Sequence, residues 1–431
     1  PTATADLTSG IYNTLKSVTL NAADNIDTNP LIYYSTDNGI TWNNKPKTVT
    51  INLNQGLTNL MFYAMDLATN KCTTQTNTYT IDTTIPTVTA DLTSGIYNTL
   101  KSVTLNAADN LDTNPLIYYS TDNGLTTKIQ PKTVTINLNE GITTLMFYAM
   151  DSAGNKCTKQ TNTYTIDTTI PTASANPKSG SYNTDKIVTL SMNKDGSIYY
   201  TIDGSVPTTS STKYTATIPI TTTTVLKFLA VDLACNLSPI YTETYNIDKV
   251  APTASANLNS GLYNTNKLVT LSMSEPGSIF YSLNGGTPNT LYTNPITISW
   301  TCNLKYNAVD MANNPSPTYT QTYTIDKVAP KVSKTSPTNG KTGISRTSYI
   351  YIKFSEKFKK STYWSKIRVK NLKTGKYLSI RKYISGNLLK IKTSKRSAHR
   401  WYQVIIPQAA IQDYAGNNQK TTYTFKFKTR G

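Results

Sequence analysis

The chain has 431 residues, a formal net charge of +18 and no apolar run approaching the roughly 20 residues that a membrane-spanning helix needs. Thr, Tyr, Ile, Val and Asn are abundant and helix-forming runs are missing, so the composition favours β-strands and excludes a helical protein. The charge is uneven, because residues 330–431 hold 24 Lys and Arg against two acidic residues (+22), whereas residues 1–329 balance to −4.

A nine-residue stretch, which we call the seam, recurs four times along the chain. In each copy a Tyr and a Pro lie seven positions apart, with Ile and Asp at the third and fourth positions. Alternating Tyr, Thr and Ile predict a strand, and the Pro ends its pairing in a central ladder. We therefore expect each seam to be the end of one domain and the start of the next. The copies are Tyr79–Thr87, Tyr164–Thr172, Tyr245–Thr253 and Tyr323–Lys331.

The seams divide the chain into five predicted domains, each large enough to bury its own core. Because the connectors are short, neighbouring domains have little room to swing apart, which predicts an extended rod. The boundaries are 1–85 (repeat 1), 86–170 (repeat 2), 171–251 (repeat 3), 252–329 (repeat 4) and 330–431 (the basic C-terminal domain).

Repeat 1 shows the strand pattern expected of all four repeats. Six or seven short strands between turn-rich segments predict a two-sheet sandwich with Greek-key connections. A second landmark, Ser9–Thr14, returns in every repeat; we expect its Gly to form a turn with positive φ and its Tyr to cap the core. The predicted strands are 2–7, 17–23, 31–36, 48–53, 59–65 and 72–81.

Each repeat contains one cysteine, so no disulfide can form within a repeat. Cys72 and Cys157 occupy equivalent positions, whereas Cys235 and Cys302 lie elsewhere in their repeats. We expect small, partly buried thiols, with pairing between repeats or chains as the alternative. Cysteine usage leaves the redox compartment open.

Repeat 3 contains the sharpest motif, Tyr199-Tyr-Thr-Ile-Asp-Gly-Ser-Val-Pro-Thr208, followed by Ala230-Val-Asp-Leu-Ala-Cys-Asn236. It resembles the chitobiase/β-hexosaminidase C-terminal-like domain, and the other repeats carry weaker versions. The resemblance implies an immunoglobulin-like sandwich and an accessory, non-catalytic role. The Asp-Gly and Asn-Gly pairs themselves predict hairpin turns.

The C-terminal domain contains Ser336-Pro-Thr-Asn-Gly340, Phe354-Ser-Glu356 and Asp413-Tyr-Ala-Gly-Asn417. This order resembles a bacterial and archaeal Ig-like domain family. The whole arrangement is similar to the ectodomains of methanogen cell-surface adhesin-like proteins.

No motif for catalysis is present, because the chain has one His and neither an activated nucleophile nor a paired acid and base. We therefore expect no enzymatic activity and no cofactor. Structural calcium is a further hypothesis: related Ig-like rods bind calcium at seam carboxylates, which favours Asp82 and Asp167, since Lys249 and Lys327 follow the other two seam Asp residues. The alternative for these carboxylates is a turn or capping role.

The basic domain interleaves cationic and aromatic residues on predicted strands. Alternation places the charges on one face and the apolar residues in the core, which predicts a surface for an anionic cell-wall polymer, a glycan or a membrane face; a solvated strand face is the alternative. No nucleic-acid-binding motif is present. The candidates are Trp364, Lys366, Arg368, Lys370, Arg381, Lys382, Lys390, Lys392, Arg396, Arg400 and Trp401.

Together these features predict a non-enzymatic, extracellular or cell-surface adhesin-like protein. The repeats would act as a spacer and the basic domain as an anchor or ligand-binding end. The alternatives are a carbohydrate-binding accessory region of a larger glycosidase and a subunit of a self-assembling filament or lattice. The chain begins directly in a repeat, so a signal peptide has been removed or the sequence is an excerpt.

Overall fold

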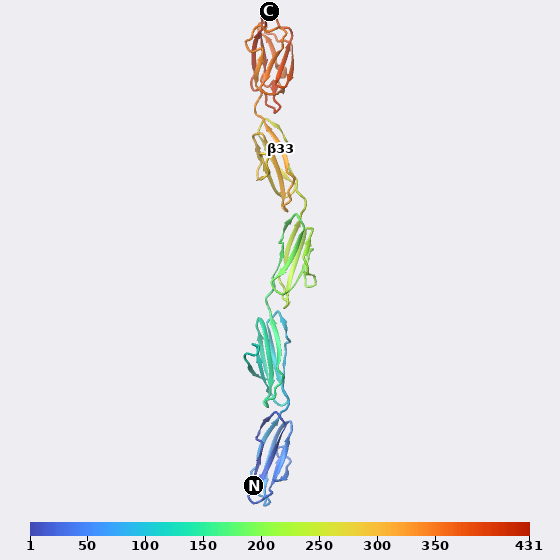
Figure 1. The fold of residues 1–431 in the computed structure, drawn as a ribbon, viewed down its shortest axis with the longest axis vertical. Coiled ribbons are helices and arrows are strands. Elements are labelled where there is room, and N and C mark those ends of the chain that lie inside the picture. The colour runs from blue at the N-terminus through green and yellow to red at the C-terminus, as the bar shows by residue number, and fades with distance from the viewer. The chain divides into compact units, whose positions relative to one another are not determined.

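The computed structural model describes all 431 residues, and strands dominate the ribbon along the whole chain (Figure 1). The one helical element is a 3-10 turn, η1 (Trp364–Lys366). The chain divides into two compact units, residues 1–177 with 188–218 and 225–243, and residues 178–187 with 219–224 and 244–431. The all-β prediction is confirmed, whereas the division into five domains and the rod shape stay predictions. No helix has the length and apolar character needed to span a membrane.

Repeat 1 is a sandwich of a three-stranded sheet, in the order β1-β3-β6, and a five-stranded sheet, in the order β2-β8-β7-β4-β5. The six predicted strands are all present, and two short strands, β2 and β5, were missed. The bounds are β1 (Thr2–Ala5), β2 (Gly10–Tyr12), β3 (Lys16–Ala23), β4 (Leu31–Ser35), β5 (Asn43–Pro46), β6 (Thr48–Leu53), β7 (Gly56–Met65) and β8 (Gln75–Ile81).

The core of repeat 1 lies between these sheets. Alternate residues of β3 and β7 point inward, so Val18 and Leu20 meet Phe62 and form one buried cluster. Tyr79, the first residue of the seam, is also fully buried, and its hydroxyl donates to the carbonyl of Leu7 at 2.7 Å. The seam thus begins as a core strand, as the sequence predicted, and leaves the sandwich after Ile81.

The Ser9–Thr14 landmark differs from the prediction. Gly10 does not adopt positive φ; it begins β2, which pairs in parallel with β8. A Cβ atom at Gly10 would lie 3.3 Å from the hydroxyl oxygen of Tyr12, so side-chain space explains the glycine better than a turn does. Tyr12 does pack against the core, as expected. Positive φ occurs instead after β4, at Asn38 (61°) and Gly39 (86°).

Repeat 2 repeats this topology, with sheets in the orders β14-β11-β9 and β10-β16-β15-β12-β13 around its own buried cluster. The bounds are β9 (Thr87–Ala90), β10 (Gly95–Tyr97), β11 (Lys101–Ala108), β12 (Leu116–Ser120), β13 (Lys128–Pro131), β14 (Thr133–Leu138), β15 (Gly141–Met150) and β16 (Gln160–Ile166).

Repeat 3 is divided between the two compact units. In the first unit β17 pairs with β19, and β20 pairs with β21 and β23; in the second unit β18 pairs in parallel with β24. The bounds are β17 (Ala173–Asn176), β18 (Gly180–Tyr182), β19 (Lys186–Met192), β20 (Gly196–Thr201), β21 (Thr212–Lys213), β22 (Ile218–Ile220), β23 (Thr224–Asp232) and β24 (Tyr241–Ile247).

Repeat 4 keeps the five-stranded sheet, in the order β26-β33-β32-β29-β30, with β33 labelled in Figure 1. Two strand pairs, β25-β28 and β27-β31, form the opposite layer. The bounds are β25 (Ala254–Ala256), β26 (Gly261–Tyr263), β27 (Lys267–Val269), β28 (Leu271–Met273), β29 (Gly277–Ser282), β30 (Thr290–Leu291), β31 (Ile296–Ile298), β32 (Cys302–Asp310) and β33 (Tyr319–Ile325).

The basic C-terminal domain has a four-stranded sheet, β34-β35-β39-β38, and a three-stranded sheet, β37-β40-β42, around the largest buried cluster of the chain. Strands β36 and β41 form a separate pair. The bounds are β34 (Val332–Ser336), β35 (Ile350–Phe354), β36 (Lys359–Lys360), β37 (Arg368–Asn371), β38 (Ile380–Ser385), β39 (Leu388–Thr393), β40 (Trp401–Ile406), β41 (Ile411–Gln412) and β42 (Tyr423–Lys428).

Candidate functional site

All four seams are tied to the following domain by the same hydrogen bond. An Asn side-chain amide of that domain donates to the backbone carbonyl of the seam Asp. Each Asn ends an Asp-x-Ala-x-Asn turn, and the turn Asp accepts hydrogen bonds from its backbone N–H and its amide. The pairs are Asn155 with Asp82 (2.7 Å), Asn236 with Asp167 (2.7 Å), Asn314 with Asp248 (2.8 Å) and Asn417 with Asp326 (2.7 Å).

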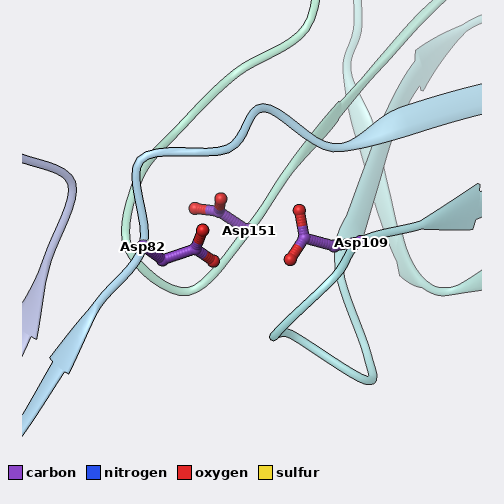
Figure 2. Close-up of side chains that lie close together, drawn as sticks. All are labelled: Asp82, Asp109 and Asp151. Carbon is purple, nitrogen blue, oxygen red and sulfur yellow. The ribbon is translucent and has the colours of Figure 1, made fainter. Parts of the chain in front are cut away.

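At three seams the seam Asp and the turn Asp meet a third carboxylate. In each group one oxygen of every carboxylate lies within 4.8 Å of the other two. Figure 2 shows the three side chains of the first seam pointing toward one another. Carboxylates gathered in this way offer the oxygen ligands that hard divalent cations prefer. The groups are Asp82, Asp109 and Asp151; Asp248, Glu275 and Asp310; and Asp326, Glu356 and Asp413.

The third carboxylate comes from an equivalent place in each repeat. Asp109 and Glu275 both lie 23 residues after the Pro that opens their repeat, just beyond the strand that pairs with the first strand of that repeat. Glu356 follows β35, the corresponding strand of the C-terminal domain. Sequence reasoning missed all three residues, although aligning the repeats on their prolines would have placed Asp109, Lys194 and Glu275 in one column.

At the second seam this column holds Lys194. Its ammonium nitrogen lies 2.6 and 2.9 Å from the two carboxylate oxygens of Asp167 and 3.2 Å from Oδ2 of Asp232. It also donates to the carbonyl oxygen and the hydroxyl oxygen of Thr169, each at 2.5 Å. Five oxygens therefore surround one positive charge between the seam Asp and the turn Asp.

The pKa values of these carboxyl groups depend on burial and on the charged groups beside them. Burial, and then the charges of Asp248 and Asp310, raise the pKa of Glu275. Burial raises the pKa of Glu356 as well, with Asp326 and Asp413 adding to the shift. In contrast, the hydrogen bond from Lys194 lowers the pKa of Asp167. Carboxylates repel one another at the third and fourth seams, whereas the lysine relieves that repulsion at the second.

At Asp167 the structure does not favour the calcium prediction, because the Lys194 ammonium already contacts both oxygens of that carboxylate. Asp82 does belong to a carboxylate group. The lysines that seemed to disfavour the other seams point elsewhere: Lys249 forms an ion pair with Asp185 at 2.5 Å, and Lys327 donates to the carbonyl of Ser299. Asp248 and Asp326 therefore join the candidate set.

The predicted polyanion-binding residues are divided between the two sheets of the basic domain. Lys366, Arg368, Lys370 and Trp401 lie on or beside β37 and β40, whereas the residues from Arg381 to Lys392 lie on β38 and β39. Lys366, Arg381 and Lys392 are exposed, and Trp364, Arg368, Lys370, Lys382, Lys390, Arg400 and Trp401 are partly buried.

Arg396 is a correction to this set, because its side chain is 0% exposed. It lies in the loop after β39, where strand alternation does not apply. Its guanidinium donates to the carbonyls of Ser345 and Ser348 and to the hydroxyl of Thr393, and it packs over the Phe427 ring. Burial lowers its pKa. Arg396 therefore organises the core of the domain and cannot contact a polymer.

The outward face of β35, β39 and β38 is the clearest cationic surface. Lys390 stands between Tyr351 and Tyr383, its directly paired neighbours on either side, while Leu389 points into the core. Its ammonium lies 3.9 Å from the centre of the Tyr349 ring. Arg381 and Lys392 form the next cross-strand pair on the same face. We call Tyr349, Tyr351, Arg381, Tyr383, Lys390 and Lys392 the basic sheet face.

A surface pocket of about 450 Å³ lies beside β40 and brings Arg400 and Trp401 together with residues that the sequence reasoning missed. The Lys426 ammonium lies 5.5 Å from the centre of the Trp401 ring. Outward alternation along β42 was a signal for Lys426, but only the fold shows that this strand borders β40. The pocket is lined by Leu372, Lys373, His399, Arg400, Trp401 and Lys426.

Comparison with known families agrees with this geometry. Residues 177–242 and 258–320 match the model of the chitobiase/beta-hexosaminidase C-terminal domain, and residues 326–429 match the model of a bacterial Ig-like domain. Repeats 3 and 4 and the C-terminal domain therefore match two immunoglobulin-like domain families. The family resemblances predicted from the motifs are confirmed, and the methanogen context stays a hypothesis. No curated protein matches the chain.

Solved structures similar to these Ig-like repeats have low identity and low TM-scores. The tetra-tandem repeat of a large adhesion protein is 12% identical and covers 76% of this chain and 99% of its own, with a TM-score of 0.30. A structure from a bacterial ice-binding adhesin is 13% identical. It covers 55% of this chain and 92% of its own, with a TM-score of 0.24. Fibronectin(III)-like modules of Clostridium thermocellum CbhA are 14% identical. They cover 38% of this chain and 94% of their own, with a TM-score of 0.23.

Proposed function

We propose that this chain is a non-enzymatic, adhesin-like protein of the cell surface or extracellular space. The four repeats act as a spacer, and the basic C-terminal domain binds an anionic wall polymer or glycan. The observation that carries this proposal is the concentration of +22 charge in residues 330–431, with cationic side chains set between aromatic rings on the basic sheet face. Such a surface attracts polyanions at long range and adds ring contacts at close range.

The binding test uses the full chain with dextran sulfate, and neutral dextran of the same length as the comparison. Replacing Arg381, Lys390 and Lys392 together by Ala removes three charges from the basic sheet face. At about 0.5 kcal/mol for each exposed contact, binding should weaken about tenfold. A second triple variant, at Lys373, Arg400 and Lys426, tests the Trp401 pocket.

The matched control replaces three exposed lysines of the repeats, Lys45, Lys159 and Lys213, by Ala. This control should bind as the unaltered chain does, because it changes the net charge equally but leaves the basic domain intact. Affinity should fall steeply as salt rises. Equal weakening by the control and both basic-domain variants would reject the proposal, since the binding would then depend on net charge alone.

The alternative function, a carbohydrate-binding accessory region of a glycosidase, draws support from the family model matched by repeats 3 and 4. It predicts binding to a neutral polysaccharide such as chitin, with little dependence on salt. Binding of chitin by the full chain that survives the basic-domain substitutions would favour this alternative.

A further inference from the structure

The four seams can be compared with one another at one position, which carries a negative side chain at three seams and a positive one at the second. The place that a third carboxylate takes at three seams, Asp109, Glu275 or Glu356, is taken by Lys194 at the second. The seam Asp and the turn Asp are present at all four. At the second seam, the cation that the seam Asp and the turn Asp bind is the ammonium group of a lysine in the chain itself.

The cation at the second seam is held by a nearly complete oxygen shell. Asp167 contributes two oxygens, Asp232 one, and Thr169 its carbonyl and hydroxyl, all within 3.2 Å of the Lys194 nitrogen. Asp232 is buried, so the ammonium compensates a carboxylate that water reaches poorly. In the first seam Thr84 is the counterpart of Thr169, and it offers the same carbonyl and hydroxyl groups.

The first seam has the same two carboxylates without that compensation. Asp82 is 2% exposed and Asp151 is 3% exposed, and their hydrogen-bond donors are neutral: the Gln55 amide and the Thr84 N–H donate to Asp82, and Asn155 donates to Asp151. Oδ1 of Asp109 is buried and accepts no hydrogen bond, although its Oδ2 accepts two from backbone N–H groups. Three carboxylates thus meet at the first seam, and one of them has a buried oxygen that accepts no hydrogen bond, whereas the second seam has the Lys194 ammonium beside the seam Asp and the turn Asp.

We propose that the first, third and fourth seams each bind one hard divalent cation, of the calcium class, between the seam Asp, the turn Asp and the third carboxylate, and that the Lys194 ammonium replaces this cation at the second seam. Three carboxylates suit a divalent ion better than a monovalent one, and backbone carbonyls of the connectors complete an all-oxygen set. The cation fastens the connector to the following domain at three seams. The second seam is fastened permanently, whatever the cation concentration.

The test is calcium titration of the full chain by calorimetry at 0.15 M NaCl, after removal of bound metal with a chelator. Three sites should saturate in the unaltered chain. Lys194→Asp gives the second seam the same three carboxylates as the first and should raise the number to four. Asp109→Lys gives the first seam the lysine of the second and should lower the number to two. Lys213→Asp, which makes the same charge change at an exposed position of β21, should leave three.

Hydrogen exchange provides a second readout that does not depend on counting. Calcium should slow amide exchange in the connectors at 82–86, 248–252 and 326–330 and leave 167–171 unchanged. Absence of saturable binding, or a stoichiometry that Lys194→Asp and Asp109→Lys do not move, would overturn the proposal. Lys194→Asp adds a site, so loss of folding in the Asp109 variant does not weaken the test. Polyanion binding by the C-terminal domain is a separate readout that neither result affects.

Discussion

The side-chain amide of Asn155 donates a hydrogen bond to the backbone carbonyl of Asp82, 2.7 Å away, although 73 residues separate them. The same amide also donates to Asp151, so one side chain joins the end of repeat 1 to a turn of repeat 2. This contact recurs at every seam, so the Asn that ends each of these four turns also holds the seam before it.

Replacing Asn155 by Ala should loosen the first seam. The Asp82 carbonyl and a buried carboxylate each lose a donor, which should cost about 1–3 kcal/mol of local stability. Hydrogen exchange of the 151–155 turn and of the 82–86 connector measures the change. Asn110→Ala, at an exposed position of the same repeat, is the control and should alter neither segment. Unchanged exchange in the Asn155 variant would show that the contact does not hold the seam.

The Cys157 thiol should be replaceable by a hydroxyl but not by a hydrocarbon. Its sulfur accepts a hydrogen bond from the backbone N–H of Ala149, and in repeat 3 the Ser238 hydroxyl accepts the equivalent bond from Ala230. Cys157→Ser should therefore keep the stability of the chain within about 0.5 kcal/mol, whereas Cys157→Val should lose about 1 kcal/mol. Chemical denaturation compares the two variants, and equal losses would contradict the assigned role of the sulfur.

Tyr323 should make repeat 4 sensitive to alkaline pH. Its buried hydroxyl donates to the carbonyl of Leu258 at 2.7 Å, and burial, followed by neighbouring tyrosines, raises its pKa to about 12. The folded state therefore holds this proton more tightly than the unfolded state does. Its contribution to stability is complete below pH 10 and should be lost as pH rises from about 10 to 12.

Tyr323→Phe checks this assignment. The variant should be less stable by about 1–3 kcal/mol at neutral pH, because the Leu258 carbonyl loses its donor. Its stability should also fall less between pH 10 and 12 than that of the unaltered chain. Tyr414→Phe, at a position that is 61% exposed, should change neither quantity. An unaltered pH profile in Tyr323→Phe would refute the role of this hydroxyl.

Substituting the buried Arg396 should lower the stability of the basic domain, whereas substituting the exposed Arg381 should weaken polyanion binding. Arg396→Ala removes a buried cation with several hydrogen bonds and opens a cavity, so the domain should lose about 3–5 kcal/mol. Arg381→Ala, on the exposed basic sheet face, should change stability by about 0.5 kcal/mol or less and weaken dextran sulfate binding instead. Thermal unfolding and binding of both variants measure the contrast. Similar stabilities would show that Arg396 is not part of the core.

The sequence predicted most of the fold because local patterns determine it. The alternation of Val18, Leu20 and Ala22 identifies β3 without tertiary information, and the seam predicts both a strand end and a connector. Strand β5 escaped notice because all four of its residues are exposed, and it pairs only as an edge of β4. Gly10 was misassigned because a three-residue strand has no period to detect.

The candidate sites were less predictable, because they depend on distant contacts. Asp82, Asp109 and Asp151 are separated by 27 and 42 residues, and only the sandwich brings their oxygens together. The sequence analysis did not single out Lys194, and only the structure places its ammonium on Asp167. Strand alternation placed Lys392 on the exposed face, as the structure has it, but it gave no information on Arg396, whose loop has no regular pattern.

Hydrogen exchange of the full chain with and without dextran sulfate tests most directly where the chain binds a polyanion. The proposed function predicts slower exchange in residues 330–431 alone, strongest in β38 and β39. Protection spread evenly over residues 1–329, or none in the basic domain at a saturating polymer concentration, would contradict it.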